Sequence, residues 1–594
     1  MAKSNTIKKS AGTANSGKGD KVAGATTRTV KTVDVKETKS GGNGRGIPKT
    51  AHKKKAVNPV KTSKAKTVAL ASMLAALPLL PRAAARLAQA EGERKGYSVE
   101  QFKLTARDGT RLSASLYVPR GEGPFPALIM IHSWLFMRWQ CHLYAPYFAS
   151  AGYVVLTYDC RGWGSSRGEV HCADPEREIC DLEDVIDWLL EKSGLPLKEG
   201  ALGVTGISYG GGHSFLIAAR DPRVKTVVPM NGWTELKRAM NPNNSPKSIW
   251  SLLLLVSATW ATKLNPGNIL YRWFNTVLFK RKEMKGYDED MRRRSCLHEV
   301  EKVNTPMLIV GSWNDDLFEP NQMMDFYEKL DAPKMLYISN GPHGLDPGFG
   351  PRWWGKDIWD LTRRWFDFWL KGEENGILSE PAVRLYRPWN RRMESEPDWP
   401  PPGVRTHTVY LGRENGDFKM TSRPKGERGE ARLQPNLLSL AHSGPPVMRP
   451  QSFGLQVKGP RKDAGDGYFS FTTSPAKKDF ELVGIPRLRV NIKPLEARAQ
   501  INALLYDVPP EGGRPVLITY GTTTLEEMLP GVDMTVDMDL VAVDYLLKQG
   551  HCFRLTLSGT NLPFFLPVLG VGVKIIYGDG ESGLQLPLRE VAAN

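Results

Sequence analysis

Six short apolar runs separated by segments with helical spacing constrain the fold of this chain more than any other feature. The runs, each four to seven residues long, occupy 127–132, 153–159, 202–205, 224–230, 307–310 and 335–339. In the intervening segment 178–191, four apolar side chains share one helical face. Buried parallel strands read as short apolar runs, and helices usually connect them. The sequence therefore predicts an α/β fold with a mostly parallel sheet over residues 97–375, preceded by a hairpin around Asp108-Gly109.

The alternation breaks twice. Residues 231–302 are Trp-rich and mostly helical in pattern, which predicts a cap insertion over the C-terminal edge of the sheet. The apolar stretch 249–261 within it is too short to span a bilayer and is predicted to form a buried cap helix. Residues 376–594 show short alternating runs without helical spacing, which predict a C-terminal all-β domain, a β-sandwich of the jelly-roll kind.

The positive charge of the chain is concentrated at its N-terminus. The whole chain carries +17, and residues 1–66 alone carry +14 without a single Phe, Trp or Tyr. Such a segment cannot bury enough apolar surface to fold, so we expect a disordered basic tail. The tail either attracts a polyanion or a membrane surface, or is a solvated extension that aids solubility. The remaining net charge of +3 does not indicate a nucleic-acid-binding body.

Residues 67–96 form an apolar or amphipathic segment with more than one interpretation. The apolar run 67–80 follows lysines and precedes Ala88-Gln89-Ala90, as in a signal peptide. The long basic stretch before it and the arginines after it are equally consistent with an amphipathic helix on the protein body or on a membrane. Localisation therefore stays open between a cytoplasmic, an exported and a membrane-associated protein. The oligomeric state is open too.

We expect no cofactor and no metal ion. The six cysteines include no C-x-x-C pair, and Cys160, His171, Cys172 and Cys180 lack the tight ligand pairs of structural zinc sites. A dinucleotide site at Gly162-x-Gly164 is disfavoured because the third glycine falls one position beyond the G-x-G-x-x-G spacing.

The motif Gly206-Ile207-Ser208-Tyr209-Gly210 matches the Gly-x-Ser-x-Gly nucleophile elbow. A predicted strand precedes it and a helix follows it, as the elbow requires. Ser208 is therefore the candidate nucleophile. A serine hydroxyl needs a base to remove its proton, and the base needs an acid to orient it.

The base and the acid are expected downstream, at the ends of the next two strands. His343 follows the strand at 335–339 and is the candidate base, and Asp315 follows the strand at 307–310 and is the candidate acid. Asp316 is the alternative acid. His132, at the end of the first core strand, is expected to support the neighbouring loop.

The oxyanion of an acyl-transfer intermediate needs two hydrogen-bond donors. The backbone N–H of Tyr209, directly after the nucleophile, is expected to supply one. The backbone N–H of Trp134, in the loop after the first core strand, is our candidate for the other.

The chain also resembles the X-Pro dipeptidyl-peptidase and cocaine esterase family of serine hydrolases. The resemblance covers about residues 97–590 and rests on six segments. They are Asp159-Cys160-Arg161-Gly162-Trp163-Gly164-Ser165-Ser166-Arg167-Gly168-Glu169, Ser208-Tyr209-Gly210-Gly211, Gly341-Pro342-His343-Gly344, Trp365-Phe366-Asp367-Phe368-Trp369-Leu370-Lys371-Gly372, Leu504-Leu505-Tyr506-Asp507-Val508 and Gly550-His551-Cys552-Phe553-Arg554-Leu555. It implies an α/β-hydrolase core, a helical cap and a C-terminal jelly roll, acting on esters or amides.

One departure from the family bears on the substrate. Esterases of this family often carry a Tyr in the oxyanion loop, whereas this loop reads Ser133-Trp134-Leu135-Phe136. We therefore predict a serine hydrolase of small-molecule or peptide substrates that cleaves esters or amides, Xaa-Pro peptides among them, through an acyl-enzyme. The alternatives are a dipeptidyl-peptidase in the strict sense, which needs an acidic pocket for the substrate's amino terminus, and a catalytically idle binding protein.

Overall fold

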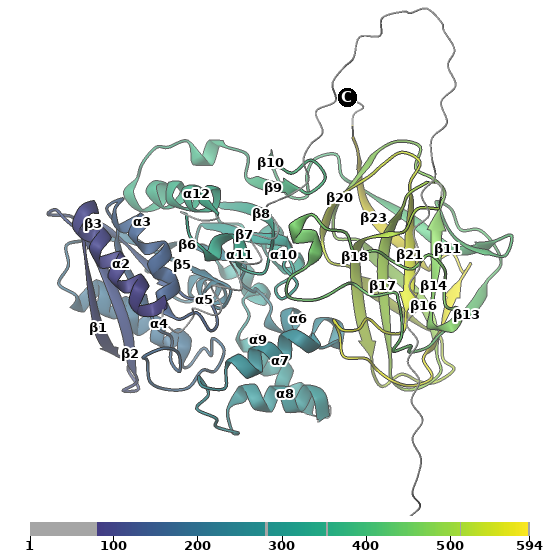
Figure 1. The fold of residues 1–594 in the computed structure, drawn as a ribbon, viewed down its shortest axis with the longest axis horizontal. Helices are drawn as coiled ribbons and strands as arrows, with labels where there is room; N and C mark the ends of the chain where they lie inside the picture. Colours follow the sequence, from purple (N-terminus) through teal and green to yellow (C-terminus); the bar gives the residue numbers. More distant parts are fainter. Residues whose placement is uncertain (1–79, 280–282, 352–354, 511, 592–594) are drawn as a thin grey trace, which may run out of the picture. The chain divides into compact units, whose positions relative to one another are not determined.

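The computed structural model describes residues 80–279, 283–351, 355–510 and 512–591 (Figure 1). These residues belong to one compact unit, 62–594. The predicted basic tail and the apolar run before residue 80 lie outside the described residues. Within the described ranges, no helix has the length and apolar character needed to cross a membrane.

The first sheet has ten strands in the order β1-β2-β4-β3-β5-β6-β7-β8-β9-β10. Neighbours from β4 to β9 pair in parallel, and the strands at both edges pair antiparallel. The predicted parallel sheet and its N-terminal hairpin are therefore confirmed. The strands are β1 (Tyr97–Thr105), β2 (Arg111–Pro119), β3 (Phe125–Ile131), β4 (Val154–Tyr158), β5 (Leu197–Ile207), β6 (Val224–Met230), β7 (Met307–Asn314), β8 (Lys334–Pro342), β9 (Val383–Arg387) and β10 (Arg392–Glu396).

Helices cover both faces of this sheet, which explains its continuous apolar strands. Successive residues of a strand point to opposite faces. Leu128 and Met130 of β3 pack in one core with the helices α2, α3 and α12, and Ile129 and Ile131 pack in the other with α4, α5 and α10. The helices are α2 (Leu80–Lys95), α3 (Ala145–Ala149), α4 (Glu178–Asp187), α5 (Tyr209–Ala218), α10 (Asn321–Lys329) and α12 (Lys356–Phe366).

Residues 376–396 correct one expectation. Their alternating pattern predicted that they belong to the C-terminal all-β domain, but β9 pairs in parallel with β8 and β10 pairs with β9, so both extend the first sheet. An alternating pattern predicts a half-buried strand without specifying which sheet receives it. Arg387 of β9, fully buried, forms an ion pair with Asp544 of the second sheet.

The second sheet has 13 strands, antiparallel except for the pair β12–β14. Its alternating side chains, such as those of β16, form a separate apolar core. The strands are β11 (Arg405–Glu414), β12 (Asp417–Thr421), β13 (Gly429–Leu433), β14 (Tyr468–Thr473), β15 (Phe480–Gly484), β16 (Arg487–Pro494), β17 (Ala499–Val508), β18 (Val516–Leu525), β19 (Met534–Asp539), β20 (Val543–Leu547), β21 (Cys552–Ser558), β22 (Val573–Tyr577) and β23 (Gly583–Glu590).

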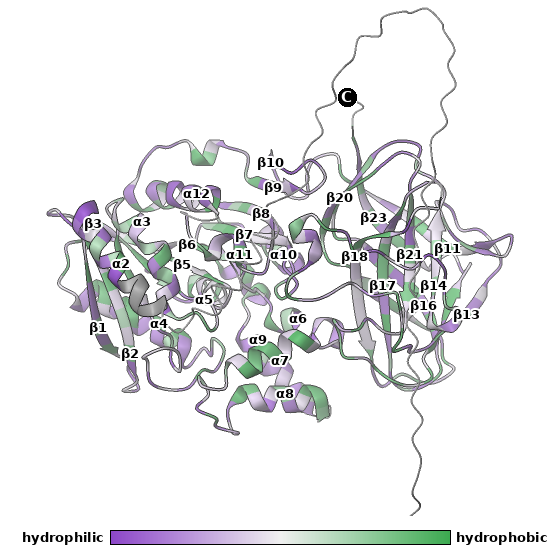
Figure 2. Ribbon diagram, viewed as in Figure 1, coloured by the Kyte–Doolittle hydropathy of each residue, from purple (hydrophilic) through white to green (hydrophobic). Residues whose placement is uncertain are grey.

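Between β6 and β7 the chain forms a group of cap helices, α6 (Leu236–Met240), α7 (Ser248–Ser257), α8 (Ile269–Phe279) and α9 (Met284–Arg293). The prediction that 249–261 is a buried cap helix is wrong. Most side chains of α7 are partly or largely exposed, and within that helix Trp250 is the buried residue. The helix carries apolar side chains both on the side that lines a cavity and on the side that faces solvent (Figure 2).

Candidate active site

Ser208 occupies a sharp turn between a strand and a helix. Strand β5 ends at Ile207 and helix α5 begins at Tyr209, and the serine between them has φ 58° and ψ −110°. A non-glycine residue with positive φ is strained, and such strain is typical of functional turns. A Cβ on Gly206 would lie 2.5 Å from the backbone of Gly210, so only glycine lets strand and helix approach this closely.

The structure brings the three predicted polar residues together. The Oγ of Ser208 lies 2.7 Å from Nε2 of His343, and Nδ1 of His343 lies 2.9 and 2.8 Å from the two carboxylate oxygens of Asp315. Asp315 and Ser208 are buried, and His343 is nearly so. A hydroxyl, an imidazole and a carboxylate in this order can pass a proton from the serine to the histidine.

The carboxylate of Asp315 is held by the chain around it. The backbone N–H groups of Leu317 and Phe318 donate to its Oδ1, and the side-chain amide of Asn231 donates to its Oδ2. Asn231, which follows β6 with φ 45°, was not predicted as a site residue. Its signal was its place at the C-terminal end of a core strand, the edge at which the other site residues lie.

The alternative residues have other contacts. Asp316, buried beside the candidate acid, accepts hydrogen bonds from the indole of Trp250 and from the backbone N–H of Val447. His132 accepts the backbone N–H of Cys160 at Nε2 and contacts the carbonyl of Ser133 at Nδ1. It supports the loop after β3, as expected.

The rings of Trp250 and Phe318 lie edge-on to the imidazole of His343, with centroids 5.6 and 5.0 Å away. Trp250 was also missed by sequence reasoning, because α7 is distant in the chain from every motif. Rings packed on two sides limit the rotation of the histidine.

The candidate oxyanion donors belong to Tyr209 and Trp134. Tyr209 is the first residue of α5, so its backbone N–H has no carbonyl partner one turn earlier within the helix. Trp134 follows β3, and its ring contacts the ring of Tyr209 edge-on at 5.1 Å. The indole of Trp134 donates to the hydroxyl of Ser257 on α7, so the cap helix holds this loop. Both residues line the same cavity as Ser208.

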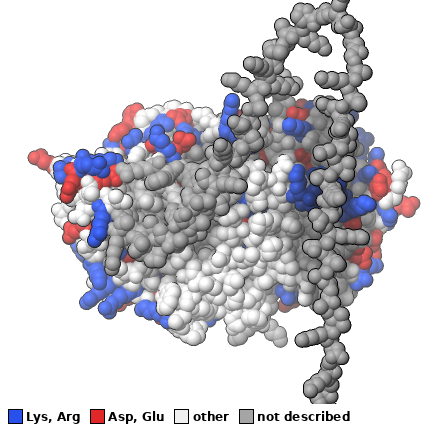
Figure 3. All heavy atoms as spheres, in the orientation of Figure 1, with Lys and Arg blue, Asp and Glu red and all other residues white. Residues whose placement is uncertain are grey.

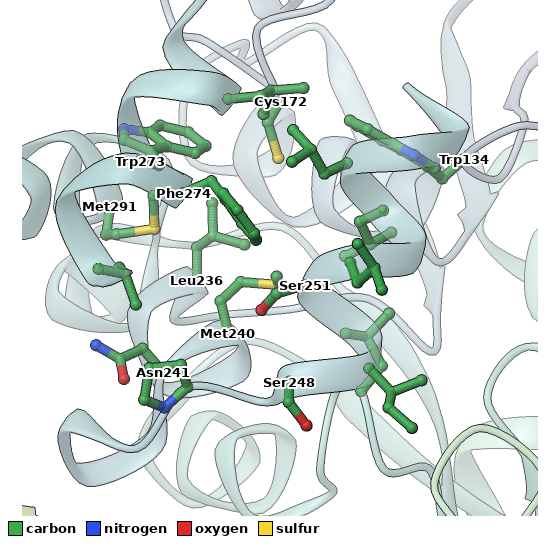
Figure 4. Close-up of a pocket in the computed structure, with 18 of the residues that line it drawn as sticks. Trp134, Cys172, Leu236, Met240, Asn241, Ser248, Ser251, Trp273, Phe274 and Met291 are labelled. Carbon is green, nitrogen blue, oxygen red and sulfur yellow. The ribbon is translucent and has the colours of Figure 1, made fainter. Parts of the chain in front are cut away.

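That cavity has a volume of about 360 Å³ and lies between the elbow and the cap. Figure 4 shows the side chains of Leu236, Met240 and Phe274 facing the helix that carries Ser251. Among the described residues that line the cavity, none is Asp, Glu, Lys or Arg. The apolar lining side chains are Trp134, Trp233, Leu236, Met240, Pro246, Ile249, Leu252, Leu254, Leu255, Leu270, Trp273, Phe274, Val277, Leu278, Met291, Leu317, Phe318 and Leu566.

The six cysteines are free thiols. Cys172 reaches the cavity, but burial raises the pKa of its thiol to about 12, so it is protonated at neutral pH and is a poor nucleophile. In the described parts of the chain, no group of three or more His, Cys, Asp or Glu side chains is arranged to hold a metal ion.

Two family models match the chain. The model of the X-Pro dipeptidyl-peptidase (S15 family) covers residues 108–345, and the model of the X-Pro dipeptidyl-peptidase C-terminal non-catalytic domain covers residues 375–575. A Bacillus anthracis protein named "Putative Xaa-Pro dipeptidyl-peptidase" is 23% identical over 458 residues, 71% of each chain. The cocaine esterase of Rhodococcus sp. (strain MB1 Bresler) is 24% identical over 541 residues, 79% of this chain and 92% of the esterase.

A solved structure shares the fold. The CocE/NonD family hydrolase from Staphylococcus aureus superposes with a TM-score of 0.63 at 17% identity, over 82% of this chain and 93% of its own. The sheet order, the elbow and these matches define an enzyme of the α/β-hydrolase class, a serine hydrolase. Within that class, the chain belongs to the X-Pro dipeptidyl-peptidase and cocaine esterase family, as its sequence motifs indicated.

Proposed function

We propose that this protein is a serine esterase that hydrolyses esters with an apolar acyl or alkyl group. Ser208 attacks the ester carbonyl while His343 takes its proton, and Asp315 orients the imidazole and stabilises its charged form. The backbone N–H groups of Tyr209 and Trp134 donate to the oxyanion. His343 then protonates the leaving alcohol and activates the water that releases the acid.

This proposal rests on the apolar lining of the cavity. Apolar side chains of the cap dominate the lining next to Ser208, and none of the described lining residues is charged. Burial of an apolar group is worth about 25 cal/mol per Å², whereas an unpaired charge in such a place is strongly unfavourable. An apolar chain or ring is therefore the ligand that fits.

The same observation weighs against a strict dipeptidyl-peptidase. A substrate with a free amino terminus needs a carboxylate to receive its ammonium group, and the two buried carboxylates nearest the site, Asp315 and Asp316, are already engaged. Peptide hydrolysis is the second candidate function, because some relatives are named as dipeptidyl-peptidases.

A substrate screen tests the proposal. p-Nitrophenyl esters of increasing acyl length should be hydrolysed, with kcat/KM rising with acyl length until the cavity is full, and Xaa-Pro amides should react far more slowly. Faster turnover of the amides would reverse the two candidates. Labelling of the wild type by a fluorophosphonate probe, but not of Ser208→Ala, separates an active hydrolase from an idle binding protein.

The basic tail is proposed to bind polyanions. Residues 1–66 carry +14 with no aromatic side chain, so the attraction rests on charge and should weaken with salt. It supplies no catalytic group in this proposal.

A further inference from the structure

Helix α7 carries apolar side chains on the side that faces away from the cavity. Leu254 and Leu255 line the cavity, but Leu253, Val256 and Trp260 do not. Their exposed fractions are 44%, 61% and 83%. Spacings of three and four residues place these side chains on one face of a helix and its last turn. Solubility in water does not require three exposed apolar side chains on one face of a helix.

Further exposed apolar side chains lie nearby in the cap. Together, Leu252, Leu253, Val256, Trp260, Leu264 and Phe279 form what we call the cap face. Figure 3 shows a broad area without charged side chains around the cap helices of Figure 1. Contiguous exposed apolar surface of this kind marks a site of interaction.

The charges of the stretch that carries the cap face, residues 236–279, have one sign. Residues 236–279 contain five Lys and Arg and no Asp or Glu. Three of the five are paired, with Asp288, Asp325 and Glu319. Lys263 and Arg272 are exposed, and the structure gives neither an ion pair within its described residues. The cap face is therefore an apolar surface with two unneutralised cations at its side.

We propose that the cap face binds the surface of an anionic phospholipid bilayer. Apolar side chains and a tryptophan would enter the boundary between headgroups and acyl chains, and the two cations would contact lipid phosphates. The long stems of Lys263 and Arg272 allow their charges to stay at the headgroups.

The cap face also reaches the catalytic cavity. Leu252 is more than half exposed and lines the cavity as well, so bilayer and cavity would meet at α7. An apolar ester could then move from the bilayer towards Ser208 without crossing water. This route rests on the proposed esterase function, whereas bilayer binding does not.

A second copy of this chain is a less suitable occupant. In a twofold interface the same surface meets itself, so Lys263 and Arg272 of both copies would approach without an acidic residue from 236–279 to neutralise them. Phospholipid phosphates remove this repulsion.

Co-sedimentation with phosphatidylcholine vesicles containing phosphatidylglycerol tests the proposal on the full-length protein. We choose about 0.5 M salt, at which the charge-based contribution of residues 1–66 is small. Residues 67–96 are present in every variant, so any contribution they make to binding is the same in each. Leu253→Ser/Val256→Ser/Trp260→Ser should lower the bound fraction at least about tenfold, because three apolar side chains no longer enter the bilayer. The matched variant Leu438→Ser/Leu529→Ser/Val532→Ser removes exposed apolar side chains of the second-sheet region and should bind as the wild type does.

Charge reversal gives a second measurement. At about physiological salt, Lys263→Glu/Arg272→Glu should weaken vesicle binding at least about 30-fold, since two cations are lost and each strengthens binding to an anionic surface about fivefold. Lys302→Glu/Lys356→Glu, at exposed positions outside the cap face, is the control.

The possible results of these experiments distinguish bilayer binding from the alternatives. Equal binding by the wild type and the cap-face variant overturns the proposal, as does equal loss in the apolar control. A wild-type dimer that becomes a monomer in the cap-face variant, without vesicle binding by either, assigns the surface to a second copy instead. An unchanged melting temperature shows that the variant is folded. Vesicle binding needs no turnover, so failure of the esterase proposal would be recognised independently.

Discussion

The indole N–H of Trp250 on α7 donates to the carboxylate of Asp316, 3.0 Å away, one residue after the carboxylate that contacts His343. The same indole ring lies edge-on to His343. Burial raises the pKa of Asp316, and its second oxygen accepts the backbone N–H of Val447. Through this pair the cap helix is attached to the loop that positions the candidate base.

Trp250→Phe tests this attachment. The phenyl ring keeps a contact with His343 but leaves a buried carboxylate oxygen without its donor, so the free energy of unfolding should fall by about 1–3 kcal/mol. We also expect kcat to fall, because the histidine is less well held. Trp389→Phe removes a similar indole bond, to Asp544, away from the site. Urea unfolding and kcat should show a stability loss in both variants and a kcat loss in Trp250→Phe alone.

Substitution of the Ser208, His343 and Asp315 side chains should separate their roles. Ser208→Ala and His343→Ala should each lower kcat on the order of 10³-fold or more. Asp315→Asn should lower it on the order of 10⁴-fold, because an amide favours the wrong histidine tautomer. Asp316→Asn should cost less than about tenfold by the same reasoning, since Asp316 does not contact the imidazole. If Asp316→Asn is the more damaging of the two, Asp315 is not the acid.

The size of the cavity should limit the length of the apolar group that the substrate carries. Leu255→Trp places a larger ring on the cavity side of α7, so the preferred acyl chain of p-nitrophenyl esters should become shorter while short esters keep their kcat/KM. Leu253→Trp makes the same exchange on the opposite side of that helix and should leave the preference unchanged. Identical chain-length profiles for both variants would place the acyl group elsewhere.

Buried histidines should make the fold sensitive to acid. Burial lowers the pKa of His142 to about 3 and that of His213 to about 4. In the unfolded chain a histidine titrates near about 6.5, so below this pH the unfolded state binds protons that the folded state does not, and stability falls. At pH 5 each histidine should cost about 2 kcal/mol relative to pH 7.5.

His213→Asn should reduce this loss of stability between pH 7.5 and 5, measured by urea unfolding. The exposed His407 on β11 provides the control, since His407→Asn should keep the full wild-type loss. A slope unaffected by His213→Asn would mean that this imidazole is already charged in the fold.

Removal of residues 1–66 should leave catalysis intact. The described residues belong to the compact unit 62–594, so kcat on a small soluble ester should stay within about twofold, because no group of the proposed mechanism is lost. Binding to heparin or nucleic acid should be lost, and in the full-length chain it should weaken steeply with salt. Unchanged polyanion binding after truncation would make the tail a solvated extension. A start near residue 97 is less suitable, because α2 packs on the body and Tyr97 donates to the carbonyl of Ala88.

The amino-acid sequence by itself was sufficient to predict the parallel sheet, the all-β C-terminal part and the elbow at Ser208. These features depend on local patterns, namely the spacing of apolar residues and the small residues that a sharp turn requires. It also indicated His343 and two neighbouring aspartates, because parallel strands end at a common edge. The family resemblance followed from the same motifs.

Tertiary structure decided what depends on contacts between distant segments. Asp315 and Asp316 are alike in sequence, and only the fold turns one towards His343 and the other towards Trp250. Strands β9 and β10 belong to the first sheet because β9 pairs with β8, which would otherwise be an edge strand. Helix α7 is mostly apolar, which indicated burial, yet one of its sides lines the cavity and the other faces solvent. Local pattern determines which side chains are apolar, whereas what covers them is set by the packing of the whole chain.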